Sequence, residues 1–590
     1  MKEKKEIFLE IKIFIFIFFL VIFFFSFTKA YDDAGGYFIC YNCSDCMAAL
    51  NNNLYNEVRL GTDIFDHENT CINNPSGFSN KVFDCQGYTI DGINTSSYNG
   101  FVITSKLNVT IKNCIIKEFN VGIYFSSTNN SKLFNNTIYN NNIGVYLRDY
   151  SFTNEIINNT ISHGYSYNVY LSQSSNNILI NNEISNSKTG IYLYQANNNN
   201  ILNNRINNNI ERGILDYLSS NNTISNNTLL GNYDGIIIHT SSDENINNNT
   251  IINCSRNALY LYYATNNNFS NNTATNNAYD YYSQYSSNNL IKNLKIDVDL
   301  VISFQENNIS LKKSVAITPP QGYKDIEKFI DIRRIGENAW IFLNISYDDS
   351  KVLEEFGIDE STLRIWKYSE GVWYNESFYT VNDVDTVNDV VYANITSFSI
   401  FAPLGIQTTC ICSSCSECNQ KLNDETCIEV KLISNILTDS ICIDNPENFT
   451  GKTLNCRGKS FLGNKVQNSY AIYIDNKSNI TIKGCKIINF DYGIIIYNSS
   501  FINLINNNIK KNNFGLYIFD SFDLNISNNS ICYNTNYDVY ASNEINGTSN
   551  TCSKTFNFNC DFICVLRCII VGLHNKNMIF ININDVCQNR

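Results

Sequence analysis

One column of residues recurs through this chain at a nearly constant spacing. Aligning the motif Gly-Ile-Tyr-Leu places nine positions in register, at intervals of 22 to 24 residues and a mean of about 22.5. A repeat of this length cannot bury its apolar face alone, so successive repeats must stack on one another. The nine positions are Gly100, Gly122, Gly144, Asn168, Gly190, Gly213, Gly235, Ala258 and Asp280.

Within each repeat, apolar residues alternate with polar ones. Ile123 and Phe125 flank Tyr124, and two further apolar columns begin at Leu133 and Ile138. This period of two predicts strands and excludes a helical repeat. Three short strands in about 22 residues are typical of one coil of a parallel β-helix. A leucine-rich repeat has a similar length, but its Leu/Asn consensus is missing here.

Asparagine is the dominant polar residue, with about 100 copies in 590 residues. Asn pairs precede the third strand of successive repeats, from Asn135-Asn136 to Asn271-Asn272. Asn tolerates left-handed backbone, and its amide can bond to the identical amide one coil away. We therefore expect a stacked amide ladder at this corner. Proline is absent between Gly100 and Asp280, as a coil whose amides donate to neighbouring coils requires.

The N-terminus has the pattern of an export signal. Lysines precede an apolar run over 13–27, and Thr28-Lys29-Ala30 then offers small residues for cleavage. The run has 15 residues, short of the roughly 20 that a membrane span needs. We expect a secreted or cell-surface protein, whose membrane contact is limited to this segment if it stays uncleaved. The net charge of −13 argues against a nucleic-acid partner.

The repeat pattern is duplicated. It returns after residue 470 at an offset of 371 or 372 residues, so that Cys43 corresponds to Cys415 and Gly122 to Gly493. Between the copies the Asn-rich repeat stops, and alternating segments predict a small β-sandwich. The expected organisation is 1–30 signal peptide, 31–99 Cys-rich cap and first coil, 100–297 parallel β-helix, 298–405 β-sandwich-like module, 406–470 second Cys-rich cap, 471–545 second short parallel β-helix, and 546–590 C-terminal tail of unknown role.

Several motifs carry a family resemblance. Residues 83–92 (Phe-Asp-Cys-Gln-Gly-Tyr-Thr-Ile-Asp-Gly), 108–114 and 122–125 resemble the opening coils of NosD-type right-handed parallel β-helix proteins of the pectin-lyase-like superfamily. The resemblance implies an all-β, right-handed parallel β-helix. This fold hosts lyases, hydrolases, epimerases and inert scaffolds, so it implies no single activity. Residues 357–363 and 395–401 resemble the PGF-pre-PGF module that accompanies such β-helices in archaeal surface proteins.

The resembled family is nominally copper-binding, and copper needs imidazole, thiolate or thioether donors. His67, His163, His239 and His574 are scattered along the chain, and one of the three Met is the initiator. We therefore expect no metal and no cofactor.

Catalysis on this fold would need carboxylates that converge on neighbouring coils, with calcium and a basic residue in the lyases. Coil arithmetic places Asp216 on an inward slot, and Arg148 with Asp149 forms one adjacent outward pair, for which a solvated ion pair is the alternative. No outward cluster is predicted. The carboxylates that the coils offer are Asp149, Asp216, Asp234, Asp243 and Asp280.

The cysteines allow two interpretations. The spacings Cys40-x2-Cys43-x2-Cys46 and Cys410-x-Cys412-x2-Cys415-x2-Cys418 could ligate zinc or an iron–sulfur cluster. An exported chain meets oxidising conditions, which favours disulfides that staple each cap. The count of 21 is odd, so at least one thiol is free or intermolecular. The disulfide candidates are Cys40, Cys43, Cys46, Cys71, Cys85, Cys114, Cys412, Cys415, Cys418, Cys442, Cys456 and Cys485, with Cys85 and Cys114 as one pair and Cys456 and Cys485 as its copy.

Tyrosines form outward columns on the first strand of the coils. Aromatic rings spaced by about 4.8 Å could bind the sugar rings of a polymer, or could form a self-stacking ladder that stabilises the sheet. One column holds Tyr124, Tyr146, Tyr170, Tyr192, Tyr260 and Tyr282, and a second holds Tyr194, Tyr217 and Tyr262.

About 23 Asn-x-Ser/Thr sequons occur, and so Asn-rich a chain generates some of them by chance. Candidates for N-glycosylation include Asn108, Asn135, Asn158, Asn226, Asn248, Asn271, Asn344, Asn394, Asn479 and Asn525.

Taken together, these patterns predict an exported, non-catalytic cell-surface scaffold. Its expected partner is polysaccharide or another cell-surface protein, contacted through the Tyr columns. The alternative is a carbohydrate-active enzyme of the pectin-lyase-like superfamily, a lyase, hydrolase or epimerase acting on surface polysaccharide.

Overall fold

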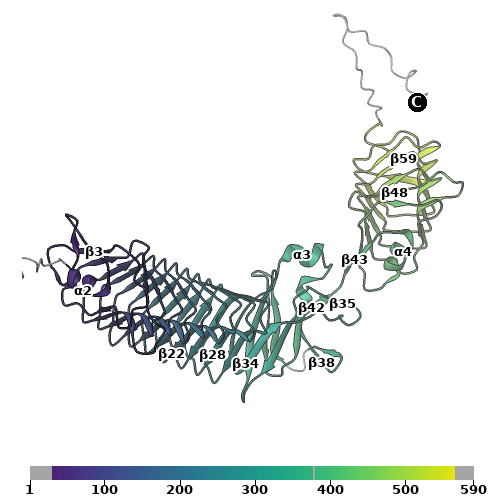
Figure 1. The fold of residues 1–590 in the computed structure, drawn as a ribbon. Helices are drawn as coiled ribbons and strands as arrows, with labels where there is room; N and C mark the ends of the chain where they lie inside the picture. Colours follow the sequence, from purple (N-terminus) through teal and green to yellow (C-terminus); the bar gives the residue numbers. More distant parts are fainter. Residues whose placement is uncertain (1–29, 376–378, 565–590) are drawn as a thin grey trace, which may run out of the picture. The chain divides into compact units, whose positions relative to one another are not determined.

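The computed structural model describes residues 30–375 and 379–564. Residues 1–29 of the expected signal peptide, His574 and the end of the expected tail lie outside these ranges. In the described part the chain is almost entirely strand, with short helices α2 (Cys43–Asn51), α3 (Asp349–Glu354), α4 (Cys415–Asn423) and η1 (Glu360–Thr362). None of these helices is long and apolar enough to span a membrane. The chain divides into two compact units, each visible in Figure 1.

The first unit contains a parallel β-helix. A coil consists of one six-residue strand and two three-residue strands, as in β7 (Asn99–Thr104), β8 (Thr110–Lys112) and β9 (Ile115–Lys117). Each strand pairs in parallel with its counterpart in the next coil, so that Ile123 lies beside Val145. The prediction of an all-β solenoid with coils of about 22 residues is confirmed.

Three sets of strands make up these coils. The first is β4 (Ile72–Asn73), β7, β10 (Val121–Ser126), β13 (Ile143–Arg148), β16 (Tyr167–Ser172), β19 (Thr189–Tyr194), β22 (Arg212–Tyr217), β25 (Asp234–His239), β28 (Asn257–Tyr262) and β31 (Tyr279–Gln284). The second is β3 (Glu57–Leu60), β5 (Val82–Asp84), β8, β11 (Lys132–Phe134), β14 (Glu155–Ile157), β17 (Ile178–Ile180), β20 (Asn200–Leu202), β23 (Thr223–Ser225), β26 (Asn245–Asn247) and β29 (Asn268–Ser270). The third is β6 (Thr89–Asp91), β9, β12 (Thr137–Tyr139), β15 (Thr160–Ser162), β18 (Glu183–Ser185), β21 (Arg205–Asn207), β24 (Thr228–Leu230), β27 (Thr250–Ile252) and β30 (Thr273–Thr275).

The Asn pairs build the corner between the two short strands. The first Asn of each pair turns the chain with a positive φ, 54° at Asn203, and the second is buried. The buried Asn204 donates from Nδ2 to Oδ1 of Asn227 at 3.1 Å, and its own Oδ1 accepts from Nδ2 of Asn182 at 2.9 Å. The expected amide ladder is thus present, and it runs unbroken through Asn136, Asn159, Asn182, Asn204, Asn227, Asn249 and Asn272.

After the last coil, the strands change from parallel to antiparallel pairing. β34 (Ile309–Lys313) pairs antiparallel with β31, and β33 (Val301–Asn307) pairs antiparallel with β32 (Leu290–Lys295). The predicted strands of the middle block therefore continue the sheets of the first β-helix. The remaining strands are β36 (Ile330–Arg334), β37 (Trp340–Ser346), β38 (Arg364–Ser369), β39 (Val372–Tyr374), β40 (Tyr379–Asp385), β41 (Val390–Ile395), β42 (Ile400–Ile406), and β35 (Tyr323–Asp325) of the second unit.

The second unit repeats the cap and a shorter β-helix. In both caps a buried lysine donates to carbonyl groups at the C-terminus of the helix. In the first cap Lys81 donates to Leu50 O and Asn52 O. In the second, Lys452, 371 residues later, donates to Leu422 O and Asp424 O. The strands are β43 (Thr409–Cys412), β44 (Glu429–Leu432), β45 (Ile436–Leu437), β46 (Ile443–Asp444), β47 (Thr453–Asn455), β48 (Ser460–Leu462), β49 (Tyr470–Asp475), β50 (Thr481–Lys483), β51 (Lys486–Ile488), β52 (Tyr492–Tyr497), β53 (Asn503–Ile505), β54 (Asn508–Lys510), β55 (Phe514–Phe519), β56 (Asn525–Ser527), β57 (Ser530–Cys532), β58 (Tyr537–Asn546) and β59 (Thr555–Asn559).

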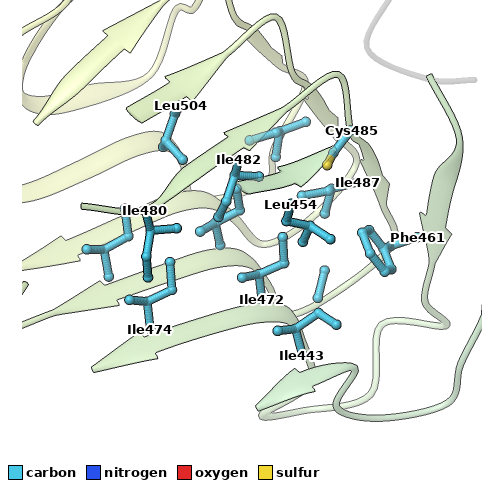
Figure 2. Packing of buried hydrophobic residues seen from close by; sticks show 14 of the residues in the cluster. Ile443, Leu454, Phe461, Ile472, Ile474, Ile480, Ile482, Cys485, Ile487 and Leu504 are labelled. Carbon is cyan, nitrogen blue, oxygen red and sulfur yellow. The ribbon is translucent and has the colours of Figure 1, made fainter. Parts of the chain in front are cut away.

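The core of this second β-helix consists of vertical stacks of like residues. Leu454, Ile482 and Leu504 lie one above the other on successive coils, and Phe461 stacks on Ile487 (Figure 2). All five are at most 1% exposed. Burying one such side chain stabilises a fold by about 1.5–3 kcal/mol, so each coil adds its own increment of stability.

The cysteines are oxidised in the same way in both caps. Cys40–Cys46, Cys43–Cys71 and Cys85–Cys114 correspond to Cys412–Cys418, Cys415–Cys442 and Cys456–Cys485. The disulfide interpretation is therefore correct, and these thiols are not left to ligate zinc or iron. The second unit adds Cys410–Cys427, Cys532–Cys564 and Cys552–Cys560, and in the described residues Cys254 alone is free. Because disulfides persist in oxidising compartments, these nine indicate an extracytoplasmic location.

Candidate functional site: the aromatic face of the first β-helix

The outward face of the six-residue strands carries two aromatic columns, which we call the aromatic face. In the first column Tyr146 lies beside Tyr124 and Tyr170, and Tyr192 continues the row. Leu215 and Ile237 then interrupt it before Tyr260 and Tyr282, as the gap in the tyrosine column between Tyr192 and Tyr260 indicates. The second column holds Tyr194, Tyr217, His239 and Tyr262.

The centre of the first column is a stack of parallel rings. The ring centroids of Tyr146 and Tyr170 are 4.6 Å apart with planes 8° from parallel, and those of Tyr170 and Tyr192 are 4.8 Å apart at 5°. The column ends in edge-to-face pairs, at Tyr124–Tyr146 and Tyr260–Tyr282. Stacked rings cover one another's faces, so this segment supports the ladder interpretation. A sugar can reach only the ring edges and hydroxyls there.

The second column includes a histidine. Tyr217 and His239 stack at 4.5 Å and 14°, and Tyr194 and Tyr262 flank them at 5.7 and 5.0 Å. Burial lowers the pKa of His239, and the nearby positive charge of Arg212 lowers it further. His239 therefore acts as a neutral member of the stack. From the sequence, His239 is only one of four scattered histidines, because the outward columns were aligned on tyrosine.

Three tyrosines at the far end of the second column form a more exposed group, the Tyr262 cluster (Tyr262, Tyr263 and Tyr285). Tyr263 and Tyr285 are 50% and 51% exposed and stack at 5.0 Å and 19°. Tyr262 meets Tyr263 edge-on at 4.6 Å and Tyr285 at 5.9 Å. The sequence search missed Tyr263 and Tyr285 because they lie one position past the strand, in the corner. The adjacent pair Tyr262-Tyr263 is the sequence feature that could have revealed the cluster.

Charged groups beside the aromatic face are paired with one another. Arg148 contacts Asp149 at 2.8 Å on the surface, and Arg256 pairs with the buried Asp234. Lys188 and Arg212 share Glu211, at 3.2 and 2.9 Å. Burial, together with neighbouring phenols, raises the pKa of Tyr146 to about 12. The face is thus neutral at physiological pH, with phenols as its hydrogen-bonding groups.

The candidate catalytic carboxylates do not converge. Asp216 is buried inside the coil, as its slot predicts, and Asp280 is buried where it accepts from the backbone N–H of Lys313. Asp243 lies exposed at a corner and accepts from Ser242. With Asp149 and Asp234 held in ion pairs, none of the five is placed to share a substrate with another.

Metal donors do not converge either. In the described residues no three His, Cys, Asp or Glu side chains could hold one ion. His67, His163 and His239 stand apart, Met47 accepts from the backbone N–H of Asn73, and the cap thiols are disulfides. The donor set in this part of the chain does not fit copper.

The sequon asparagines occupy two kinds of position. Asn344 and Asn394 are half-buried on the neighbouring strands β37 and β41. The others are exposed, and most of them have a positive φ; they are Asn108, Asn135, Asn158, Asn226, Asn248, Asn271, Asn479 and Asn525.

Comparison with solved structures finds matches at low identity and low TM-score. A periplasmic alginate epimerase, AlgG, is 14% identical, with 45% of this chain and 79% of the epimerase covered and a TM-score of 0.30. The A-module of the mannuronan C-5 epimerase AlgE6 from Azotobacter vinelandii is 16% identical, with coverages of 41% and 72% and a TM-score of 0.30. The Dettilon tailspike protein is 13% identical, with coverages of 59% and 84% and a TM-score of 0.34. At these TM-scores the likenesses carry no conclusion about this chain. No curated protein matches the chain significantly.

Family models match both β-helices. The model described as "Right handed beta helix region" matches residues 149–296. The model described as "Periplasmic copper-binding protein (NosD)" matches residues 43–216 and 412–561, which together are more than half of the chain. Neither model covers residues 297–411. On this match the chain belongs to the NosD family of right-handed β-helix proteins.

Proposed function

We propose that this protein is an exported, cell-surface scaffold that binds carbohydrate and performs no catalysis. The observation that carries the proposal is the aromatic face, with partly exposed tyrosines along the first β-helix and a neutral charge balance. Phenol edges combine an apolar surface with hydroxyls that donate and accept hydrogen bonds, which matches the mixed character of sugar rings.

The absence of catalysis is supported by the positions of the carboxylates. Retaining glycosidases need two carboxyl groups about 5–5.5 Å apart and inverting ones about 6.5–9.5 Å. The five candidate Asp residues of the coils are buried, ion-paired or alone at a corner. We therefore favour the scaffold function over the alternative, which is a lyase, hydrolase or epimerase.

The NosD description names copper, and we propose that this chain does not share that ligand. The described imidazoles lie apart, and the described cap cysteines are oxidised. A structural role is therefore the better interpretation of this β-helix.

Location at the cell surface, N-glycosylation and a PGF-pre-PGF-like role for residues 298–405 belong to the same proposal. The nine disulfides and the exposed corner asparagines support export and modification. The PGF-pre-PGF-like role of residues 298–405 is supported only by the sequence motifs within them.

A glycan array probed with the exported protein tests the proposal. We expect binding by the wild type and loss of binding when Tyr192, Tyr194, Tyr217 and Tyr262 are replaced by Ser. The matched control replaces Tyr517 and Tyr540, which stack at 5.1 Å in the second β-helix, and should bind like the wild type. If the wild type binds no glycan, carbohydrate binding is refuted, and if the control loses binding equally, the site lies elsewhere.

A further inference from the structure

Two tyrosines of the Tyr262 cluster occupy backbone positions that disfavour bulky side chains. Tyr263 and Tyr285 have φ values of 50° and 54°, in the left-handed region where a Cβ is crowded. The same corner of other coils holds Ser127, Gln173, Gln195 and Thr240, and also the bulky Leu218 and Tyr150, all with positive φ. Tyr263 and Tyr285 differ from these in being two rings that stack on adjacent coils. Strained residues cluster at functional sites, and an observed outlier is a reason to look for a function.

This strain is not offset by burial. Both rings are half-exposed, and they stack on each other and against Tyr262. A core residue can hold an unfavourable backbone conformation through its packing, but a half-exposed side chain gains less from packing. The three rings therefore form an apolar surface on the corner of the β-helix that folding itself does not require.

The surroundings of the cluster are polar, and the charged group beside them is a carboxylate, Asp243, on the coil next to Thr265 and Asn266. Thr265 and Ser287 stack on adjacent coils beside it, followed by the exposed Asn266 and Asn288. Burial and the phenols of Tyr263 and Tyr285 raise the pKa of Tyr262, and no carboxylate or basic group takes part. Aromatic rings flanked by hydroxyls and amides, without a cation, suit a neutral sugar better than a uronic acid, which would need Lys or Arg partners.

We propose that the Tyr262 cluster, flanked by Thr265, Asn266, Ser287 and Asn288, is the docking point for a neutral glycan chain. The inference rests on the proposed carbohydrate-binding function and narrows it in two ways. It moves the contact from the stacked part of the aromatic face to the exposed corner, and it names the class of sugar. The rings provide apolar contacts for the sugar C–H groups, and the flanking side chains exchange hydrogen bonds with its hydroxyls.

The test uses the exported full-length protein with Tyr263→Gln and Tyr285→Gln together. Gln already occupies the equivalent corner position in two other coils, at Gln173 and Gln195, so the fold should be retained. Gln also avoids the sequons that Asn would create before Thr265 and Ser287. The matched control is Tyr150→Gln, at the same corner of an earlier coil, with a φ of 67° and 63% exposure.

Binding is measured by isothermal titration calorimetry with hexamers of glucose, mannose and galactose beside hexamers of galacturonate and mannuronate. We expect the wild type to bind at least one neutral hexamer, the double variant to bind it at least tenfold more weakly, and the control to stay within twofold. Melting temperatures should not fall in either variant.

Three results would overturn the proposal. If the double variant retains wild-type affinity, the docking point is elsewhere, although carbohydrate binding itself stands. If only uronate hexamers bind, the sugar class is wrong. If the wild type binds none of the hexamers and no array glycan, the proposed function fails as well.

Discussion

Replacing Glu244 by Gln should change how the stability of the first β-helix depends on pH. Glu244 and Asp216 lie inside the coils, 1% and 0% exposed. Glu244 occupies a position that Asn holds in neighbouring coils: its Oε2 accepts from the backbone N–H of Asn222 at 2.7 Å, as Oδ1 of Asn222 accepts from Asn199 at 2.8 Å. A carboxyl group thus stands where the fold otherwise uses a neutral amide.

The environment of the two carboxyls favours their protonated forms. The two carboxyls contact each other, the backbone and side-chain amides of Asn222, and the hydroxyls of Ser219 and Ser241. No basic side chain is among the groups that shift their pKa values. Burial raises both pKa values, and the charge of Asp216 raises that of Glu244 further. Because the folded pKa exceeds the unfolded one, the stabilisation is complete below about pH 4.5 and is lost as pH rises.

The magnitude follows from proton linkage. A proton that the folded state retains and the unfolded state releases lowers the free energy of unfolding by about 1.4 kcal/mol per pH unit above the unfolded pKa. For a Glu244 that stays protonated in the folded state from pH 5 to 8, the free energy of unfolding therefore falls by about 4 kcal/mol. Gln has the shape of a protonated Glu and does not titrate. We expect Glu244→Gln to match the wild type at pH 5 within about 1 kcal/mol and to be clearly more stable at pH 8.

Guanidinium unfolding followed by circular dichroism at pH 5, 6, 7 and 8 measures this difference. Glu155→Gln is the matched control, because Glu155 lies in an exposed ion pair with Lys132 at 3.0 Å and should leave the pH profile unchanged. Parallel profiles for the wild type and Glu244→Gln would refute the reasoning, since they would mean that the buried pair holds no extra proton.

Three further results are expected. Asn204→Ala breaks the amide ladder and leaves buried partners unsatisfied, so it should cost about 3 kcal/mol in guanidinium unfolding; the exposed neighbour Asn203→Ala should cost about 1 kcal/mol through its left-handed backbone, and equal effects would contradict the ladder. Replacing Cys85 and Cys114 by Ser should cost about 3–4 kcal/mol for a loop of this length, and an unchanged midpoint under non-reducing conditions would show that the pair is not formed. Copper added and then removed by gel filtration should leave well under one ion per chain, as measured by elemental analysis; a stoichiometric ion would overturn the scaffold interpretation.

The fold was predictable because its main determinants are periodic. Inward residues such as Ile123 and Leu133 recur at coil spacing, and the Asn pairs predict both the corner and the amide ladder. The cysteine registers were predictable for the same reason, through the duplication of Cys85 and Cys114 in the second unit.

The features that the sequence does not predict are local and aperiodic. Ring orientation decides whether Tyr170 offers its face or its edge, and orientation leaves no trace in residue spacing. The strain at Tyr263 depends on a corner torsion, and the burial of Glu244 is a single exception within an Asn column. The antiparallel pairing of β34 with β31 likewise follows no repeat, since it joins segments of different character.

The amide ladder also bears on how such a chain can change its length. Each carboxamide offers the same donor and acceptor to the coil on either side, so any coil can follow any other without an unmatched junction. Removing residues 182–203 would join Asn181 to Asn204 and recreate the same Asn pair, with Asn159 meeting Asn204 in place of Asn182. In-frame loss or gain of one repeat is thus a small evolutionary step. The two β-helices of this chain differ in their number of repeats. The first strand of the coil occurs nine times between residues 99 and 284 and four times between 470 and 546.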